Sequence, residues 1–119
     1  MEHVILVIED DAATREAVKA LLEMRGYKVV LTANGNDGLT KLRAGLRPCV
    51  ILLDLTMPEK SGFEFRLEQV VDPELAQIPV IIYSGDAEAY ARAADYGAAA
   101  LLQKPVGIDV LVETIEAHC

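Results

Sequence analysis

The sequence predicts an α/β fold in which helices cover both faces of a parallel sheet. Short apolar runs occupy residues 4–8, 50–53 and 80–83, and such runs are typical of strands buried on both faces. Helical segments follow these runs, so that strand and helix alternate five times along the chain. At 119 residues the chain is long enough to bury a hydrophobic core without the help of disulfides or structural metal ions. We therefore expect one doubly wound α/β domain spanning residues 1–119.

The helices have recognisable start and stop signals. Asp11 is a predicted N-cap of the first helix, and Gly26 is a suitable residue to close it. Ser61 and Glu64 have the spacing of a capping box, which predicts the start of the third helix. That helix is expected to carry three apolar residues inward: Phe63, Leu67 and Val70. Asp72-Pro73 is expected to end it.

The remaining elements have weaker or more local signals. Strands are expected at 28–31 and 99–102, and an alanine-rich helix at about 86–96. A short helix ending at Gly45 follows the turn-forming residues 34–38. The last helix has an apolar stripe at helical spacing, formed by Ile108, Leu111, Val112 and Ile115.

Composition narrows the class of protein. The net charge of −8 argues against nonspecific binding of nucleic acid by this domain. The apolar runs are too short to span a membrane, and the N-terminus lacks a basic secretory signal. Two cysteines are too few for a disulfide framework, so we expect Cys49 to pack at a strand start and Cys119 to be solvated. A reducing cytoplasm is the expected compartment.

Polar residues follow four of the predicted strands. Carboxylates stand after the first strand (Glu9 and Asp10) and at the end of the third (Asp54). Ser84 and Lys104 follow the fourth and fifth strands. In open α/β sheets the ligand site lies at the carboxyl ends of the strands, so these side chains are expected to converge.

The chemistry of this set indicates a metal ion and a phosphoryl group. Neighbouring carboxylates repel one another unless a cation or protons neutralise them. Oxygen ligands without His or Cys suit Mg²⁺ or Mn²⁺. A lysine and a hydroxyl beside them suit an anion with several oxygens. Asp54 is then a candidate nucleophile that forms an aspartyl-phosphate.

Four motifs, in their order along the chain, resemble those of the receiver domain of two-component response regulators. They span nearly the whole chain, and four of them in register are far more specific than any one alone. They are Glu9-Asp10, Asp54-Leu55-Thr56-Met57-Pro58 with Gly62, Ser84-Gly85, and Lys104-Pro105. The resemblance implies a flavodoxin-like sheet with the strand order 2-1-3-4-5.

The resemblance also implies a role for each residue. Asp54 would accept a phosphoryl group from a phosphohistidine on a sensor histidine kinase or a histidine phosphotransfer protein. Asp10, Asp54 and the backbone carbonyl of Thr56 would hold Mg²⁺ (or Mn²⁺), and Glu9 would reach it through water. Lys104 and Ser84 would contact the phosphoryl oxygens.

The resemblance further implies a switch that a partner reads. The surface formed by the helix at 86–96, strand 99–102 and the last helix would change and control a downstream protein, and a homodimer through that surface is a further expectation. Such a module catalyses only its own phosphoryl transfer and slow aspartyl-phosphate hydrolysis. Lys104-Pro105 resembles a pair often cis in the family. No output domain is expected within residues 1–119.

Some residues depart from the family pattern. Glu9 stands where Asp is commoner, and Lys60-Ser61 replaces the usual Met-Asp. Leu101 stands where the family usually has Tyr or Phe as a rotamer partner of the hydroxyl. Because leucine cannot copy the swing of an aromatic ring, we expect the signal to pass mainly from Ser84 into the following helix.

Two other functions compete with the switch. Aspartyl-phosphate hydrolases resemble this site but normally have a second Asp two residues after the nucleophile, where this chain has Thr56. An inert receiver-like module would serve only for protein contacts, and the presence of Asp10, Asp54 and Lys104 argues against it.

Overall fold

A five-stranded parallel sheet with the order β2-β1-β3-β4-β5 forms the centre of the molecule. The computed structural model describes residues 3–55, 61–85, 87–93, 97–104 and 106–119. The strands are β1 (Val4–Ile8), β2 (Lys28–Thr32), β3 (Val50–Asp54), β4 (Val80–Ser84) and β5 (Ala100–Gln103). The predicted doubly wound fold and its strand order are confirmed.

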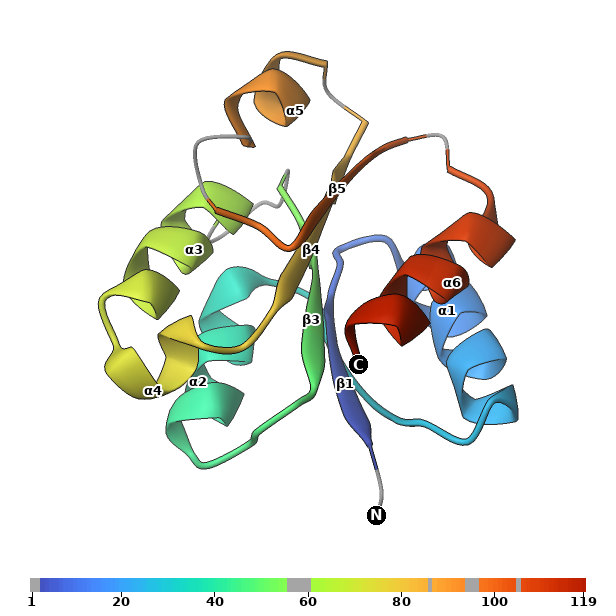
Figure 1. The fold of residues 1–119 in the computed structure, drawn as a ribbon, viewed down its shortest axis with the longest axis horizontal. Coiled ribbons are helices and arrows are strands. Elements are labelled where there is room, and N and C mark those ends of the chain that lie inside the picture. Colours follow the sequence, from blue (N-terminus) through green and yellow to red (C-terminus); the bar gives the residue numbers. More distant parts are fainter. Residues whose placement is uncertain (1–2, 56–60, 86, 94–96, 105) are drawn as a thin grey trace.

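Helices cover both faces of this sheet (Figure 1). The helices of the described residues are α1 (Ala12–Met24), α2 (Gly35–Arg43), α3 (Gly62–Val70), α4 (Pro73–Ala76), α5 (Ala87–Ala93) and α6 (Ile108–His118). Helices α1 and α6 lie on one face, whereas α2, α3, α4 and α5 lie on the other. None of the helices in the described ranges is long and apolar enough to cross a membrane.

Alternation along each strand divides the core into two halves. Ile5 and Val7 of β1 pack toward α1 and α6, whereas Leu6 and Ile8 pack toward α2 and α3. Strands β3 and β4 are buried along their whole length, as expected for central strands of a parallel sheet. This alternation decides which face each strand-end side chain reaches.

Helix α3 begins as predicted but buries a different face. Ser61 and Glu64 form the expected capping box. Leu67 and Val70, predicted to point inward, are instead 54% and 42% exposed, and Phe63 is half-buried. The buried positions are Phe65, Arg66 and Gln69.

The polar residues on this buried face are held by hydrogen bonds. Gln69 donates to the carbonyl oxygens of Leu75 (2.9 Å) and Ile78 (3.2 Å). Arg66 donates to the Gln69 side chain (2.7 Å) and to the Gly97 carbonyl (3.1 Å). Because burial of a polar side chain depends on such partners, apolar periodicity alone selected the wrong face.

Two predicted boundaries also change. Asp72-Pro73 ends α3 but also starts α4, with the Asp72 side chain accepting from the Glu74 N–H (3.0 Å) and proline in the first turn. The helix predicted at 86–96 is described as α5 over Ala87–Ala93, and its remaining positions lie outside the described residues.

The expectation that Cys119 is solvated was wrong, whereas Cys49 packs against the core just before β3, as predicted. Cys49 and Cys119 form a disulfide whose Cα atoms are 5.1 Å apart, although 70 residues separate them in sequence. Neither cysteine is fully exposed, because the last helix packs across the start of β3. The pairing follows from this tertiary approach and has no local sequence signal.

Candidate functional site

The sheet register brings polar side chains to one edge and one face. Val7, Leu52 and Ile81 are neighbours across β1, β3 and β4 on the face covered by α1 and α6. Two residues further along stand Glu9, just after β1, Asp54 at the end of β3, and Tyr83 on β4. Because side chains two apart share a face, these groups emerge together at the carboxyl edge. Lys104 follows β5 in the same alternation, since Leu102 pairs with Tyr83.

Three carboxylates meet at this edge, as predicted. Ligand oxygens of Glu9, Asp10 and Asp54 all lie within 4.8 Å of one another. Glu9 is fully buried, Asp54 is 3% exposed, and Asp10 faces solvent. A cluster with only oxygen donors and one solvent-facing member fits a hard cation such as Mg²⁺, which keeps several of its waters.

Lys104 and Tyr83 neutralise and orient the buried members of the cluster. The Lys104 ammonium lies 3.1 Å from Glu9 Oε1 and 3.7 Å from Asp54 Oδ2. The Tyr83 hydroxyl donates to the same Glu9 oxygen at 2.7 Å. Lys104 Nζ also lies 4.4 Å from the centroid of the Tyr83 ring. Lys104 therefore reaches the carboxylates, as predicted. Glu9 accepts hydrogen bonds from both Lys104 and Tyr83.

Glu9 remains ionised in this buried position. Burial by itself raises its pKa, but hydrogen bonds with Asp54, Tyr83 and Lys104 outweigh burial and lower the pKa to about 2. Burial also raises the pKa of Tyr83, and the bond to Glu9 raises it further, so the phenol stays protonated as a donor. The pair is a fixed donor and a fixed acceptor at neutral pH.

Arg15 fixes the backbone that carries the acidic pair. Its guanidinium donates to the carbonyl oxygens of Glu9 (2.8 Å) and Asp10 (2.9 Å) from the first turns of α1. Asp11 caps that helix as predicted, accepting from the Thr14 N–H (2.9 Å). The end of β1 is thus fixed in two ways: Tyr83 and Lys104 bind the Glu9 side chain, and Arg15 binds the backbone carbonyls.

Gly62 permits a close approach beside Asp54. A Cβ built there would lie 2.6 Å from the Asp54 carbonyl oxygen and 2.7 Å from Leu55 Cα. The Gly62 N–H donates to the Leu55 carbonyl (3.0 Å). Only glycine lets the start of α3 pack against the end of β3 at this distance.

Ser84 and Leu101 belong to the opposite face of the sheet. Ser84 is fully buried, follows Tyr83 on β4, and accepts the Lys104 N–H at its carbonyl oxygen (2.7 Å). Leu101 pairs with Ile82 and packs against the core on the side of α5. The two predicted switch residues thus share one face, which differs from the face of the carboxylates.

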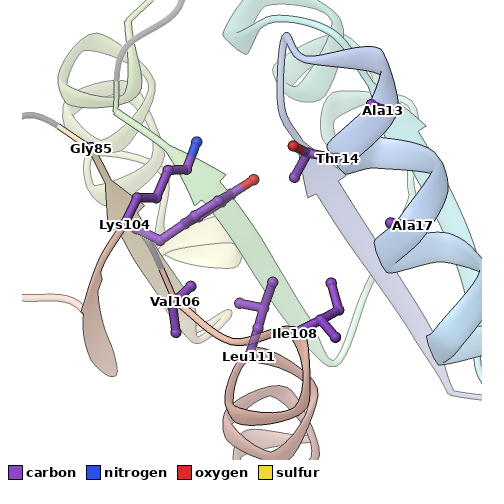
Figure 2. A pocket seen from close by; sticks show the side chains of 9 residues that line it. Ala13, Thr14, Ala17, Gly85, Lys104, Val106, Ile108 and Leu111 are labelled. Atoms are coloured by element: carbon purple, nitrogen blue, oxygen red, sulfur yellow. The ribbon is translucent and has the colours of Figure 1, made fainter.

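A cavity of about 660 Å³ opens beside the acidic edge, between α1 and α6 (Figure 2). Lys104 and Thr14 lie at one end of it, and Ile108 and Leu111 lie at the other. A polar end next to the carboxylates thus continues into an apolar wall. A ligand or partner side chain that reaches Lys104 would contact this wall.

Sequence reasoning missed two residues of this site. Tyr83 and Arg15 belong to none of the motifs identified at the strand ends. The signal available for Tyr83 was a lone aromatic hydroxyl in an aliphatic strand, one residue before Ser84. Two predicted features, the Thr56 carbonyl and the peptide bond to Pro105, lie outside the described residues.

The family of the chain follows from comparison with known proteins. A family model described as the response regulator receiver domain matches residues 5–116. The chain belongs to this family. Receiver domains are signalling modules of two-component phosphorelays that switch on phosphorylation and bind Mg²⁺ at their acidic pocket.

Similar proteins align with nearly the whole length of this receiver domain. The polar-differentiation response regulator DivK of Brucella anthropi is 32% identical, over 99% of this chain and 97% of that protein. The chemotaxis response regulator CheY4 of Vibrio cholerae has a TM-score of 0.89 and 26% identity, with 100% of both chains covered. The response regulator TrrA of Thermotoga maritima, solved in complex with Mg(2+)-BeF, has a TM-score of 0.85 and 25% identity, covering 98% and 99%.

Proposed function

We propose that Asp54 is the phosphoacceptor of this receiver domain and that a phosphohistidine of a sensor histidine kinase or a histidine phosphotransfer protein is the donor. One observation carries the proposal. The Asp54 carboxylate stands at the end of β3 inside a cluster of three acids, with the Lys104 ammonium 3.7 Å from its Oδ2. Glu9 shares this burial and these neighbours, but its Oε1 already accepts from Lys104 (3.1 Å) and from the Tyr83 hydroxyl (2.7 Å).

The reaction is a transfer between two nucleophiles. A carboxylate oxygen of Asp54 forms a bond to phosphorus as the phosphorus–nitrogen bond to the donor imidazole breaks, and the imidazole leaves with the electron pair. Lys104 attracts the phosphoryl oxygens as charge builds on them. Mg²⁺, held by Asp10, Asp54 and the Thr56 carbonyl and by Glu9 through water, would neutralise further charge there.

The phosphorylated state is proposed to be read on another surface. The phosphoryl oxygens add charge and hydrogen-bond acceptors at the sheet edge, and the Ser84 hydroxyl donates to them. The loop between β4 and α5 moves with Ser84. A downstream partner or a second copy of the domain would read the surface of α5, β5 and α6. Beyond its own phosphotransfer and slow hydrolysis of the product, the module needs no catalytic activity, and we propose that it acts in the cytoplasm.

The test compares two asparagine variants. Phosphoramidate, which contains a phosphorus–nitrogen bond, is incubated with the protein and Mg²⁺, and acid-labile phosphate is measured by intact mass. We expect stoichiometric labelling of the native protein, none of Asp54→Asn, and none of the native protein in EDTA. Asp37→Asn, an exposed position on α2, is the matched control and should label normally.

The proposal fails if Asp54→Asn is labelled as fully as the native protein while its circular dichroism spectrum is unchanged. Full labelling in EDTA would contradict the role of the metal ion but would leave Asp54 as the acceptor.

A further inference from the structure

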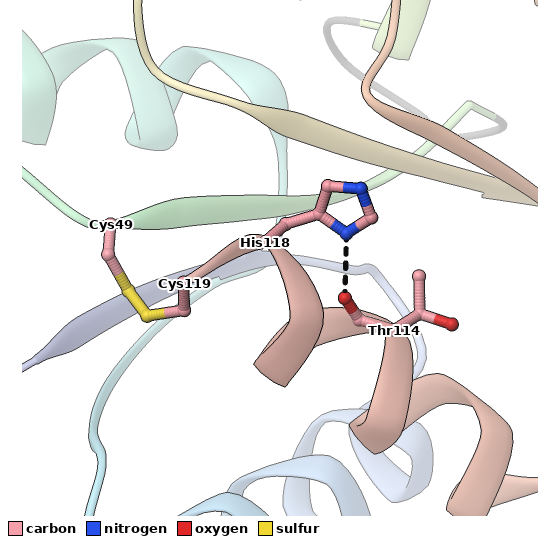
Figure 3. The surroundings of a disulfide bond; sticks show 4 residues. All are labelled: Cys49, Thr114, His118 and Cys119. Atoms are coloured by element: carbon pink, nitrogen blue, oxygen red, sulfur yellow. Dashed lines mark hydrogen bonds between the residues drawn. A yellow bond between two sulfur atoms is a disulfide. The ribbon is translucent and has the colours of Figure 1, made fainter.

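A second cluster of metal-ligating side chains lies away from the acidic edge. His3 precedes β1, Cys49 precedes β3, and Cys119 follows α6, so two of them stand at the amino end of the sheet. One ligand atom from each, an imidazole nitrogen and two sulfurs, lies within 4.8 Å of the others. The disulfide accounts for the two sulfurs in the structure (Figure 3), but it does not account for the imidazole beside them.

The backbone holds these three residues in place. The His3 carbonyl accepts from the Lys28 N–H (2.9 Å), and the Cys49 N–H donates to the Val4 carbonyl (2.8 Å). Each is therefore fixed by the β-ladder of a neighbouring strand. Cys119 is carried by α6, which buries Leu111, Val112 and Ile115 against the sheet. The cluster thus has its geometry from the core of the fold.

We propose that His3, Cys49 and Cys119 form a Zn²⁺ site when the disulfide is reduced. Two thiolates and an imidazole are donors that zinc prefers, and magnesium does not. In a tetrahedral zinc site neighbouring ligand atoms are separated by roughly 3.5–3.8 Å, as bond lengths of about 2.3 Å to sulfur and 2.0 Å to nitrogen require. The imidazole nitrogen lies no more than 4.8 Å from either sulfur, so it needs a shift of at most about 1 Å, and the two sulfurs must move apart once their bond is reduced.

The fourth position of this site faces water. His3 is exposed, and neither cysteine is fully buried. Water therefore completes the tetrahedron, as in zinc sites that have three protein ligands.

The disulfide and the zinc site exclude each other. A dithiol reductant gives two electrons and two protons to the bond, leaving two thiols in the protein and a disulfide in the reductant. Zinc then forms two bonds to sulfur and one to nitrogen, and the two thiols release their protons. In a reducing compartment zinc would take the place of the disulfide in tying α6 to the sheet.

His118 is a matched control within the same structure. It adjoins Cys119 in sequence, but its Nδ1 lies 2.8 Å from the Thr114 carbonyl, one helical turn back along α6 (Figure 3). Its ring is directed toward that carbonyl instead of toward the sulfurs. Replacing His118 therefore removes an imidazole near the cluster without removing a ligand.

The test uses Co²⁺ as a coloured substitute for Zn²⁺. Reduced protein in excess Mg²⁺, which occupies the oxygen ligands, is titrated with Co²⁺ and then with Zn²⁺. We expect one equivalent of Co²⁺ to give the absorption of thiolate-bound tetrahedral cobalt, and Zn²⁺ to abolish it. Oxidised protein and Cys49→Ser should give no such spectrum. His3→Ala should weaken binding by roughly tenfold or more, whereas His118→Ala should bind as the native protein does.

The site is refuted if reduced native protein gives no thiolate–cobalt band, or if Cys49→Ser gives the same band. Equal affinity of His3→Ala and native protein would exclude the imidazole as a ligand and would also refute the three-ligand site. None of these measurements involves phosphorylation, so their outcome is independent of the role of Asp54.

Discussion

At Glu9, burial and the neighbouring hydrogen-bond donors shift the pKa in opposite directions. A buried carboxylate ordinarily takes up a proton, yet the donors around Glu9 lower its pKa from 4.5 to about 2. Its contribution to stability is therefore fully present above pH 4.5 and is lost as the pH falls toward 2. The Tyr83 hydroxyl, at 2.7 Å, is one of the groups that keep Glu9 charged.

Removing that hydroxyl should weaken the fold in a pH-dependent way. At pH 7 we expect Tyr83→Phe to lower the free energy of unfolding by about 1.5–3 kcal/mol, because a hydrogen bond to a charged group is lost. The difference should shrink as the pH falls through about 2, because Glu9 then becomes protonated in both proteins. Urea titrations at several pH values measure it. Tyr27→Phe is the control, because the Tyr27 ring contacts His3 while its hydroxyl bonds to none of the described residues. A difference that stays constant as the pH falls through about 2 would contradict the assigned role.

The sequence was informative about single residues when they stood at strand ends. Asp10, Asp54 and Lys104 could be placed together because the carboxyl ends of parallel strands share an edge. Tyr83 could not, because a tyrosine within an aliphatic strand equally serves packing. Only the register with Asp54 shows that its hydroxyl reaches Glu9.

At the scale of helices and strands, Gly62 allows the start of α3 to pack directly against the backbone at the end of β3. Gly62→Ala should destabilise the protein by about 1–3 kcal/mol, because the added Cβ would meet backbone atoms that cannot rotate away. It should also slow phosphorylation, since the displaced atoms belong to Asp54 and Leu55. Gly107→Ala is the control: a Cβ there meets nothing within 4 Å, and stability should change by less than about 1 kcal/mol. Thermal unfolding and phosphoramidate labelling together check both effects, and equal losses in the two variants would count against this account.

The limits of sequence reasoning at this scale are clearest in α3. Its start was predictable because a capping box is local chemistry between Ser61 and Glu64. Its buried face was not, because Arg66 and Gln69 are buried while they donate to the carbonyls of Gly97 and Ile78, outside α3, and Leu67 remains exposed. The four-residue helix α4 is too short for any periodicity to reveal.

Across the whole molecule, the proposed phosphoacceptor, Asp54, and the proposed switch residues lie on opposite faces of one sheet. Strand β4 connects them, because Tyr83 and Ser84 are consecutive and so point to different sides. Leu101 is partly buried against the core next to α5 and has no polar atom to follow a phosphoryl group. We therefore expect the signal to pass through Ser84 and the loop into α5.

Hydrogen exchange on α5, with and without beryllofluoride and Mg²⁺, tests this route. Ser84→Ala should blunt the change in exchange, whereas Leu101→Ala should leave most of it. The opposite pattern, with Leu101→Ala removing the response and Ser84→Ala preserving it, would show that strand β5 carries the signal.

The bond between Cys49 and Cys119 also changes the connectivity of the chain. While it is intact, residues 49–119 form a closed ring that contains Asp54, Ser84 and Lys104, whereas Glu9 and Asp10 lie on the open segment before it. A protease that cuts once inside the ring leaves a single covalent molecule, and one that cuts before Cys49 releases the segment carrying the acidic pair. A cut before Cys49 therefore separates Glu9 and Asp10 from the groups inside the ring, whereas a cut inside the ring separates none of them covalently, and a non-reducing gel distinguishes the two products.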